Sequence, residues 1–475
     1  MIIKRMSNAH ALLTLKVEER MQMKLKFDKA FYRKVWVIVL PIIIQNLLSA
    51  AVSSADVIML NYVGQSSLSA ASLATQYGSI IYMFFFGMGT GATMLCAQYW
   101  GKGDIKTIEK VQGIALRISL AVGLLFAACA LCFPRVMMLV FTKDEELIAL
   151  GMSYLRVVSV SFVCWAISEI YLSVLRSVGR VAISTVISVV TLLLNVCFNA
   201  IFIFGLFGVP KLGIMGVGIA TSISRTVQLV MCLVVSARSQ DVKLNFSQMF
   251  VKNKLLQQDF FKMAVPAMLN DVVWGTAFSM YSVIMGHMGS DMVAANSIVS
   301  VTRNFGSVVC FALGSASGIV LGQMLGENKF EEAKIAGHRF LVLSAVTGLL
   351  GGVLVLLAAP FILEYASLTE QAKEYLRVML YMNTYYITGQ AVNTTLIAGV
   401  FRAGGDSRFG LVCDTIDMWC YAVPLGFVAA FVLKLPPMWV YFLLLTDEFV
   451  KWPWVFKRYF SYKWINNITR DTAEQ

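Results

Sequence analysis

The stretch from Pro41 to Gly101 decides the fold, and it reads PIIIQNLLSAAVSSADVIMLNYVGQSSLSAASLATQYGSIIYMFFFGMGTGATMLCAQYWG. The chain repeats it without a gap 225 positions later, from Pro266 to Gly326, as PAMLNDVVWGTAFSMYSVIMGHMGSDMVAANSIVSVTRNFGSVVCFALGSASGIVLGQMLG. A fixed long-range period indicates one structural unit that is used twice. Both copies are mainly apolar and end at a short charged segment, which is typical of a duplicated membrane transporter. Residues identical in the two copies include Pro41 and Pro266, Gly64 and Gly289, Ala70 and Ala295, Ser72 and Ser297, Phe86 and Phe311, Gly89 and Gly314, Gln98 and Gln323, and Gly101 and Gly326.

The composition of the chain excludes an ordinary soluble protein. Of its 475 residues, 58% are hydrophobic and only 14% are charged, whereas soluble proteins carry about 25% charged residues. Apolar runs of roughly 20 residues, long enough to cross a hydrocarbon core of about 30 Å, recur along the whole sequence. We therefore predict an all-α polytopic membrane protein with twelve transmembrane helices in two parallel six-helix repeats.

The twelve apolar segments divide the chain into two halves. They cover about residues 34–62, 69–99, 111–133, 153–175, 181–206, 213–235, 260–287, 292–323, 337–363, 375–401, 408–433 and 437–456. The predicted regions are a basic cytoplasmic tail (1–32), an N-terminal six-helix bundle (33–236), a cytoplasmic connecting loop (237–259), a C-terminal six-helix bundle (260–457) and a cytoplasmic C-terminal tail (458–475).

The positive charge of the chain is concentrated in its tails and in alternate loops. The net charge is +12, and because Lys and Arg cluster in both tails and in alternate loops, the positive-inside rule places both termini in the cytoplasm. We expect a multi-pass protein of the plasma or inner membrane. No soluble domain offers a surface for nucleic acid. The nine cysteines, including the pair Cys129-x-x-Cys132, lie in apolar stretches, where cysteine usually acts as a small hydrophobe.

The sequence carries no enzymatic motif. Its three histidines stand apart from carboxylates at metal-ligand spacing, and neither H-E-x-x-H nor G-x-S-x-G occurs. No Walker motif supports an ATP-driven pump. We therefore expect no enzyme activity and no cofactor, and we expect transport to draw on an ion gradient. The duplicated halves favour alternating access over a channel.

Carboxylates inside apolar segments point to function, because a charge at the centre of a membrane helix costs about 2.5–3.5 kcal/mol. Glu448 lies one helical turn before Lys451, so we expect these two residues to form a structural ion pair at the cytoplasmic face. The carboxylates within the predicted segments are Asp56, Glu169, Asp271, Asp414, Asp417, Asp447 and Glu448.

Asp56 is the strongest candidate among them. The second copy has Tyr281 at this position, and the loop near Asp56 offers no cation to pair with the carboxylate. Asp56 could exchange protons, or it could hold a sodium ion with neighbouring oxygens. We consider no metal other than sodium. The alternative is a hydrogen-bonded Asp at the membrane interface.

Polar residues of other segments accompany Asp56. Asn195 and Asn199 are four residues apart and share one helix face, where they serve either an ion site or interhelical hydrogen bonds. Thr221 lies in the next segment, and a Thr in a membrane helix often bonds its own backbone. Glu169 either lines a cavity or pairs with Arg176.

The order and spacing of these residues resemble the multidrug and toxic compound extrusion (MATE) family over about residues 35–460. The resemblance rests on Pro41, Asn46, Asp56, Gly64, Ala70, Gly89 and Ala97-Gln98-Tyr-Trp-Gly101, on the second copy, and on the turn Arg402-Ala-Gly-Gly-Asp406. The family implies twelve helices in two bundles around a V-shaped cavity. It also implies export of cationic or amphipathic drugs in exchange for H⁺ or Na⁺.

The resemblance also implies roles for individual residues. Asp56 resembles the family's first-helix acid, which binds the coupling cation, and Asn195 resembles the Asn of its fifth-helix N-x-x-x-D pattern. Asn199 stands where some members have the Asp of that pattern, and Thr221 resembles their sixth-helix Thr. These four residues form the predicted cation-coupling set.

Three further carboxylates could belong to a substrate cavity or to a second ion site: Glu169, Asp271 and Asp406. Sodium-coupled members have an acid in the seventh helix, at a position near Trp274 in this chain, and Asp271 lies one turn away. Asp271 could also cap or hydrate its helix end. Asp406 matches a turn Asp of some members, or else it caps helix 11.

We thus predict a secondary active antiporter in the lipid bilayer, monomeric, which exports drug-like organic cations or amphipathic molecules. The alternative is a flippase for a lipid-linked saccharide or another lipid of the same superfamily. A flippase would be expected to have a basic cavity, and the basic residues well inside the membrane segments, such as Arg117, Arg225 and Arg303, are few. A membrane scaffold or receptor, with no ion dependence, is a third interpretation.

Overall fold

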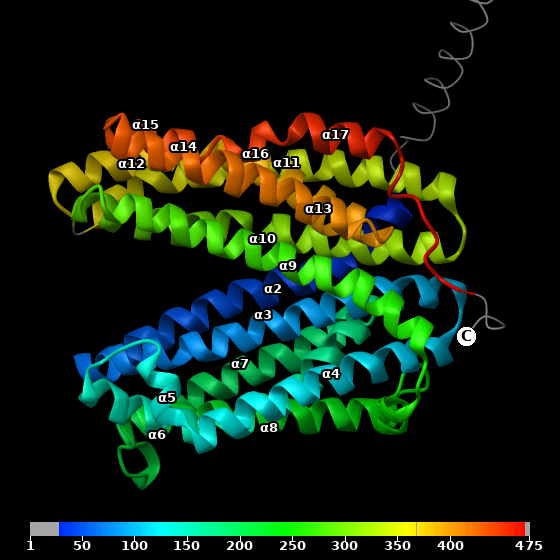
Figure 1. Ribbon diagram of the computed structural model, residues 1–475, viewed down its shortest axis with the longest axis horizontal. Coiled ribbons are helices and arrows are strands. Elements are labelled where there is room, and N and C mark those ends of the chain that lie inside the picture. The colour runs from blue at the N-terminus through cyan, green and yellow to red at the C-terminus, as the bar shows by residue number, and fades with distance from the viewer. Residues whose placement is uncertain (1–27, 367, 471–475) are drawn as a thin grey trace, which may run out of the picture.

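The computed structural model describes residues 28–366 and 368–470, and most of these residues are helical. Figure 1 shows two helical bundles side by side. The first bundle contains α2 (Lys29–Asn61), α3 (Gln65–Lys102), α4 (Ile105–Cys132), α5 (Pro134–Leu139), α6 (Glu145–Ser177), α7 (Val181–Phe204) and α8 (Gly213–Arg238). The second contains α9 (Lys254–Gly286), α10 (Ser290–Gly326), α11 (Phe330–Tyr365), α12 (Glu370–Asn393), α13 (Ser407–Asp414), α14 (Val423–Phe427), α15 (Pro437–Leu444), α16 (Asp447–Val450) and α17 (Trp452–Phe460).

Shorter helical pieces complete the second bundle and the connections. Three π-helical segments, Thr394–Phe401, Thr415–Ala422 and Val428–Val432, continue α12, α13 and α14. Short 3₁₀ turns lie at Leu206–Gly208 and, within the predicted connecting loop, at Phe246–Phe250. π-helical segments are frequent at functional sites.

Helices cover all twelve predicted segments, so the predicted all-α fold class is confirmed. Within the described residues, nine helices are long and apolar enough to span a membrane. The predicted segments 260–287, 375–401 and 437–456 are not among those nine spans. The prediction of one helix over 437–456 is wrong, because α15, α16 and α17 share this stretch. Pro453, which has no N–H to continue a preceding helix, lies in the first turn of α17.

The first helix of each repeat crosses between the bundles. The first half of α2 packs into the second bundle, where Phe31 and Val35 share a hydrophobic core with residues of α10 and α11. In α9 the arrangement is reversed, since Phe260 and Met263 lie in the core of the first bundle and Tyr281 lies in that of the second. The predicted division into bundles 33–236 and 260–457 therefore needs a correction. Half of each opening helix is packed in the other bundle's core.

Repeat-aligned glycines let α3 and α10 cross where the bundles meet. A Cβ atom on Gly101 would clash with the carbonyl of Gln323, and a Cβ atom on Gly326 would clash with the carbonyl of Gln98. Small residues allow this close approach of two helices in a membrane. The two copies of the repeated stretch therefore meet at their own C-terminal ends, and this contact closes one end of the molecule.

Two glutamines fasten the closed end from opposite sides. Gln98 Nε2 donates to the carbonyl oxygen of Ala403 in the second bundle at 2.7 Å, and Gln323 Nε2 donates to the carbonyl oxygen of Ser177 in the first bundle at 2.9 Å. Each glutamine thus reaches the end of a helix in the other bundle. We call these two hydrogen bonds the glutamine clasps.

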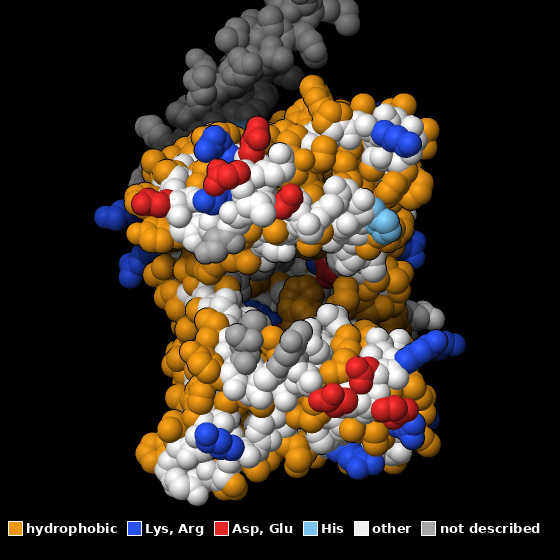
Figure 2. Space-filling view, turned by 90° about the vertical axis from the view of Figure 1, so that its left-hand side faces the viewer, with side chains coloured by type: hydrophobic (Ala, Val, Ile, Leu, Met, Phe, Trp, Pro, Cys, Tyr) orange, Lys and Arg blue, Asp and Glu red, His pale blue; other side chains and the backbone are white. Residues whose placement is uncertain are grey.

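The bundles diverge at the other end. Viewed from the left-hand side of Figure 1, the molecule has a hollow between the two bundles (Figure 2). Both ends of the described chain lie at the closed end, where Asp28 pairs with Arg339 at 3.1 Å and Asn467 donates to Asn328 at 2.7 Å. If the termini are cytoplasmic, as the loop charges predict, the hollow faces outward.

Of the predicted basic tail, residues 1–27 lie outside the described residues. Asp28 begins the described chain and caps α2, because its carboxylate accepts hydrogen bonds from the N–H groups of Ala30 and Phe31 at 3.1 and 3.2 Å. The Phe31 N–H and the Arg339 guanidinium stabilise the ionised form, so the pKa of Asp28 lies below its ordinary value.

Candidate functional site

The four residues predicted to couple a cation lie together in the first bundle. Asn199 Nδ2 donates to Asp56 Oδ1 at 2.8 Å and to Asn195 Oδ1 at 3.3 Å. Asn195 Nδ2 in turn donates to Thr221 Oγ1 at 3.3 Å. We call this series of hydrogen bonds the Asp56 chain. It connects α2 with α7 and α8, two consecutive helices that are distant from α2 in sequence.

Local sequence explains how the Asp56 chain forms. The four-residue spacing of Asn195 and Asn199 places both amides on one face of α7. Thr221 Oγ1 donates to the carbonyl of Val217 at 2.9 Å, the backbone bond expected for a Thr in a membrane helix, and it remains free to accept from Asn195. Asp56 makes no ion pair with a described Lys or Arg, so its partners are neutral.

The Asp56 chain offers oxygen ligands for a small cation. Asn199 Oδ1 is buried and accepts no hydrogen bond from any described residue. The Asp56 carboxylate, Asn195 Oδ1 and Thr221 Oγ1 are the other oxygens of the chain. Oxygen ligands of this kind suit hard cations such as sodium, whereas a proton needs the carboxylate alone. The residues present therefore fit either H⁺ or Na⁺.

A pocket of about 260 Å³ adjoins the Asp56 chain in the first bundle. Thr221 and Tyr154 both line this pocket, and Tyr154 also lies within electrostatic range of Asp56. The Arg225 guanidinium lies 4.2 Å above the centre of the Trp165 ring on the pocket wall. The pocket thus combines aromatic faces with one cation, and it touches the candidate ion site through Thr221.

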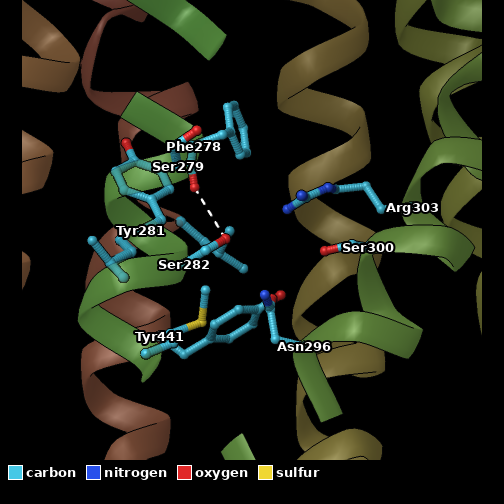
Figure 3. A pocket seen from close by; sticks show the side chains of 11 residues that line it. Phe278, Ser279, Tyr281, Ser282, Asn296, Ser300, Arg303 and Tyr441 are labelled. Atoms are coloured by element: carbon cyan, nitrogen blue, oxygen red, sulfur yellow. Dashed lines mark hydrogen bonds between the residues drawn. The ribbon is translucent and has the colours of Figure 1, made fainter. Parts of the chain in front are cut away.

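The second bundle has a pocket of about 230 Å³ between α9, α10 and α15 (Figure 3). On its wall, Ser300 and Arg303 of α10 align in the repeat with Thr75 and Gly78 of α3, which line the first pocket. Figure 3 shows Arg303 reaching toward the side chains of α9, and its guanidinium lies 4.9 Å from the centre of the Phe278 ring. The two pockets are therefore related by the internal repeat.

The remaining predicted site residues are held in ion pairs. The pairs are Glu169 with Arg176 at 3.0 Å, Asp271 with Arg402 at 2.7 Å and Asp406 with Arg458 at 2.6 Å. Glu169 was predicted either to line a cavity or to pair with Arg176, and the structure shows the pair. Asp406 occupies the N-cap position of α13, but its side chain makes no capping bond to the described residues, so the interpretation of Asp406 as a side-chain cap is wrong. Within the described residues, none of these three carboxylates is hydrogen-bonded to the Asp56 chain.

The predicted pair of Glu448 and Lys451 is present, at 3.2 Å, but its predicted place at the cytoplasmic face is wrong. The two residues are 1% and 2% exposed and lie in the interior of the second bundle. Helical spacing indicates the pair, but it cannot show that α13 and its π-helical continuation bring Asp414 and Asp417 to the same lysine.

Sequence reasoning also missed three residues that shape the pockets. Tyr154, Arg225 and Arg303 were not among the predicted site residues, and nothing in the surrounding sequence marks Tyr154. The two arginines do stand out as basic residues within predicted membrane segments, which was the available signal. Their aromatic partners lie on other helices, so only the folded chain reveals the pairing.

Sequence comparison identifies the repeated unit. The profile of the MatE family matches residues 41–201 and residues 266–428, two matches that begin at Pro41 and Pro266. The probable multidrug resistance protein YoeA of Bacillus subtilis is 24% identical over 417 residues, which cover 86% of this chain and 89% of YoeA. The multidrug resistance protein NorM of Vibrio vulnificus is 26% identical over 401 residues, covering 82% of this chain and 85% of NorM.

Solved structures share the fold. A multidrug resistance MATE family transporter of the MOP superfamily, in an outward-facing conformation, superposes with a TM-score of 0.82 at 19% identity, covering 93% of this chain and 98% of that one. A MOP superfamily transporter from Pyrococcus furiosus, described as having a binding pocket of reverse polarity, gives a TM-score of 0.81 with the same identity and coverage. Because the family profile covers well over half of the sequence, this multi-pass membrane protein belongs to the MatE family.

Proposed function

We propose that this protein is a secondary active multidrug efflux antiporter, which exports organic cations or amphipathic xenobiotics, as a monomer, in exchange for H⁺ or Na⁺ by alternating access. Membership of the MatE family and the naming of relatives as multidrug resistance proteins support the efflux function. The observation that carries the ion coupling is the Asp56 chain. It links a carboxylate within a membrane helix to a pocket wall at Thr221.

An ion that binds at Asp56 alters the hydrogen bonds that reach the pocket. A proton cancels the charge of the carboxylate to which Asn199 donates, and a sodium ion recruits the free Oδ1 of Asn199. Either event reorients the Asn199 amide, and Asn195 transmits the change to Thr221. Ion and substrate then favour different arrangements of the first bundle, which is the requirement for coupled exchange.

The test is ethidium efflux from proteoliposomes, with a proton gradient or a sodium gradient imposed separately. We expect one gradient to drive efflux by the wild type and the Asp56→Asn variant to lose this dependence. Glu331→Gln, which changes an exposed carboxylate of α11, is the matched control and should transport normally. Gradient-driven efflux that persists in Asp56→Asn would refute the coupling scheme. No efflux under either gradient would point to the flippase with a lipid-linked substrate.

The charge of the two pockets bears on the substrate. Arg225 and Arg303 make no ion pair with a described carboxylate, and each lies against an aromatic ring. Aromatic faces suit amphipathic molecules, but a guanidinium repels a cation that approaches it. The pockets therefore support amphipathic substrates, including amphiphiles that carry an acidic group, more strongly than simple organic cations.

A comparison of two dyes tests this preference. In proteoliposomes, the Arg225→Gln, Arg303→Gln double variant should export an anionic fluorescent amphiphile about tenfold more slowly, which corresponds to about 1.4 kcal/mol. Ethidium efflux by the same variant should be unchanged or faster, because two repulsive charges have been removed. Equal losses for both dyes would show that the arginines support the fold and do not select the substrate.

A further inference from the structure

A group of charged side chains lies in the interior of the second bundle. Lys451, between α16 and α17, has its Nζ 3.2 Å from Glu448 Oε2, 3.3 Å from Asp414 Oδ1 and 3.7 Å from Asp417 Oδ2. Asp447 adjoins Glu448 and is likewise sealed from solvent. We call these five residues the Lys451 cluster. Figure 1 places its helices α13 and α16 within the upper bundle, whereas α7 and α8, which contribute to the Asp56 chain, lie in the lower bundle.

The Lys451 cluster contains four carboxylates and only one ammonium group. All five residues are at most 5% exposed, so full ionisation would leave a net charge of −3 in a buried site. Each uncompensated buried charge costs several kcal/mol. Carboxylates that share one site titrate together and cannot all stay ionised. Charge balance therefore requires the cluster to hold protons.

The arginine that is connected to the cluster does not supply the missing positive charge. Arg402 forms its ion pair with Asp271 at 2.7 Å. It reaches the cluster only through Asn270, whose Oδ1 accepts from Arg402 at 3.0 Å and whose Nδ2 donates to Asp414 Oδ2 at 2.7 Å. The amide thus separates the arginine from the carboxylates, and the cluster remains short of cations.

Asp417 is the carboxylate that points most directly to a bound ion. It is 0% exposed, and neither of its side-chain oxygens has a hydrogen-bond partner within the described residues. Lys451, 3.7 Å away, is too distant for a hydrogen bond. Asp417 also lies in the π-helical segment Thr415–Ala422, and such segments are frequent at functional sites. Protonation would remove the unpaired charge and turn one oxygen into a donor.

The other groups that face the cluster are neutral or remote. Tyr281 of α9 donates to Asp447 Oδ2 at 3.0 Å, and Asn393 of α12 donates to Glu448 Oε2 at 2.6 Å. The remaining titratable or charged groups within electrostatic range of the cluster or of its tyrosines are Tyr385 and Tyr386 of α12, Cys413 of α13, Tyr441 of α15 and Arg303 of α10. Arg303 lies 5.6 Å from the centre of the Tyr386 ring, on the side of the pocket.

We propose that the Lys451 cluster is a second ion-binding site of this transporter and that it binds protons rather than sodium. The Lys451 ammonium already occupies the position between the carboxylates that an alkali cation would take. Proton uptake forms an O–H bond on one carboxylate and cancels one negative charge, and release reverses both changes. Buried carboxylates in membrane helices commonly serve as proton sites.

The Lys451 cluster is connected to the pocket of the second bundle. Tyr281 donates to Asp447 and lines this pocket, so a change of charge at the cluster alters a hydrogen bond of the pocket wall. Tyr281 is also the residue that aligns with Asp56 in the repeat. The role of the cluster in transport rests on the proposed antiport, whereas proton binding itself does not.

Infrared difference spectroscopy between acidic and alkaline pH tests proton binding without requiring transport. The full chain carries Asp56→Asn in every sample, so that the carboxyl of the Asp56 chain contributes nothing. We expect a C=O band of protonated carboxylic acid that decreases when Asp417→Asn or Glu448→Gln is added, and that Glu331→Gln leaves unchanged. Sodium chloride in place of potassium chloride should leave the band unchanged. A band that both cluster variants leave intact, or one that sodium removes, would overturn the proposal.

Thermal unfolding in detergent distinguishes a proton site from a purely structural cluster. The apparent Tm of the wild type should fall as the pH rises, because proton release leaves unbalanced negative charge inside the bundle. Asp417→Asn removes one such charge, so its Tm should fall less over the same pH range. A lower Tm for Asp417→Asn at every pH would contradict the proposal. Failure of the Asp56→Asn efflux test would leave both of these measurements valid.

Discussion

At the scale of single residues, the same position of the repeat holds an aspartate in the first copy and a tyrosine in the second. Asp56 is a carboxylate on the first helix of its repeat and accepts from Asn199 on α7. Tyr281 takes the same place in the second repeat and donates to Asp447 on α16. Both bundles thus have an interhelical hydrogen bond at this position, but in the second bundle the carboxylate lies on the partner helix.

Asn199→Ala should weaken ion coupling more than Asn195→Ala does. Asn199 makes the 2.8 Å bond to the Asp56 carboxylate, whereas the bonds of Asn195 are 3.3 Å long and join neutral groups. Loss of a hydrogen bond to a charged group costs roughly 1.5–3 kcal/mol. We therefore expect at least a tenfold rise in the ion concentration for half-maximal efflux, measured in proteoliposomes. An equal or larger effect of Asn195→Ala would argue against the order of the Asp56 chain.

At the scale of helices, the crossing of α3 and α10 depends on the absence of side chains. Gly326 presses against the carbonyl of Gln98, and the aligned Gly101 presses against that of Gln323. The helix axes can approach this closely only where no Cβ atom intervenes. This requirement explains why glycine stands at the end of both copies of the repeated stretch.

Gly326→Ala should destabilise the protein, and Gly286→Ala should not. A Cβ on Gly326 meets backbone atoms of α3, which cannot rotate away, whereas a Cβ on Gly286 meets nothing within 4 Å. Overpacking of this kind costs about 1–3 kcal/mol or more. The measurement is the apparent Tm of both variants in detergent. A Tm for Gly326→Ala equal to that of the Gly286→Ala control would mean that the helices separate without cost.

At the scale of the whole molecule, the structure has one open and one closed end. The glutamine clasps and the glycine crossing close the end that holds the chain termini. The C-terminal segment adds to the closure, because Ile468 N–H donates to Gln98 Oε1 at 2.8 Å and Arg470 pairs with Asp259. Alternating access requires these contacts to break while the hollow between the bundles closes.

Removal of both glutamine clasps should shift the population of conformers. Each hydrogen bond contributes roughly 0.5–1.5 kcal/mol, so the Gln98→Ala, Gln323→Ala double variant should lower the population of the form with the open hollow about tenfold relative to the alternative form. Electron–electron distance measurements between spin labels on the two bundles report this ratio. Gln76→Ala, at an exposed position of α3, is the control. Identical distance distributions in all three proteins would exclude a role for the clasps.

The sequence by itself determined the helices, the duplication and the membership of the Asp56 chain. Apolar length fixes where a helix can cross a membrane, and the gapless period of 225 residues relates the two halves. The four-residue spacing of Asn195 and Asn199 predicts that they share a helix face. The resemblance to the family predicted that Asp56 and Thr221 belong to the same site. The apolar length, the period and the spacing can be read from the sequence because each one lies within a single helix or in the repeat.

Only the tertiary structure decided how the two halves share their cores and where charge collects. The crossing of α2 and α9 depends on which helix faces fit together, and nothing within either helix encodes that fit. The Lys451 cluster likewise joins residues of α13, its π-helical continuation and α16. Spacing along one helix predicts Glu448 beside Lys451, but the remaining carboxylates reach the lysine through packing between helices, which has no period in the sequence.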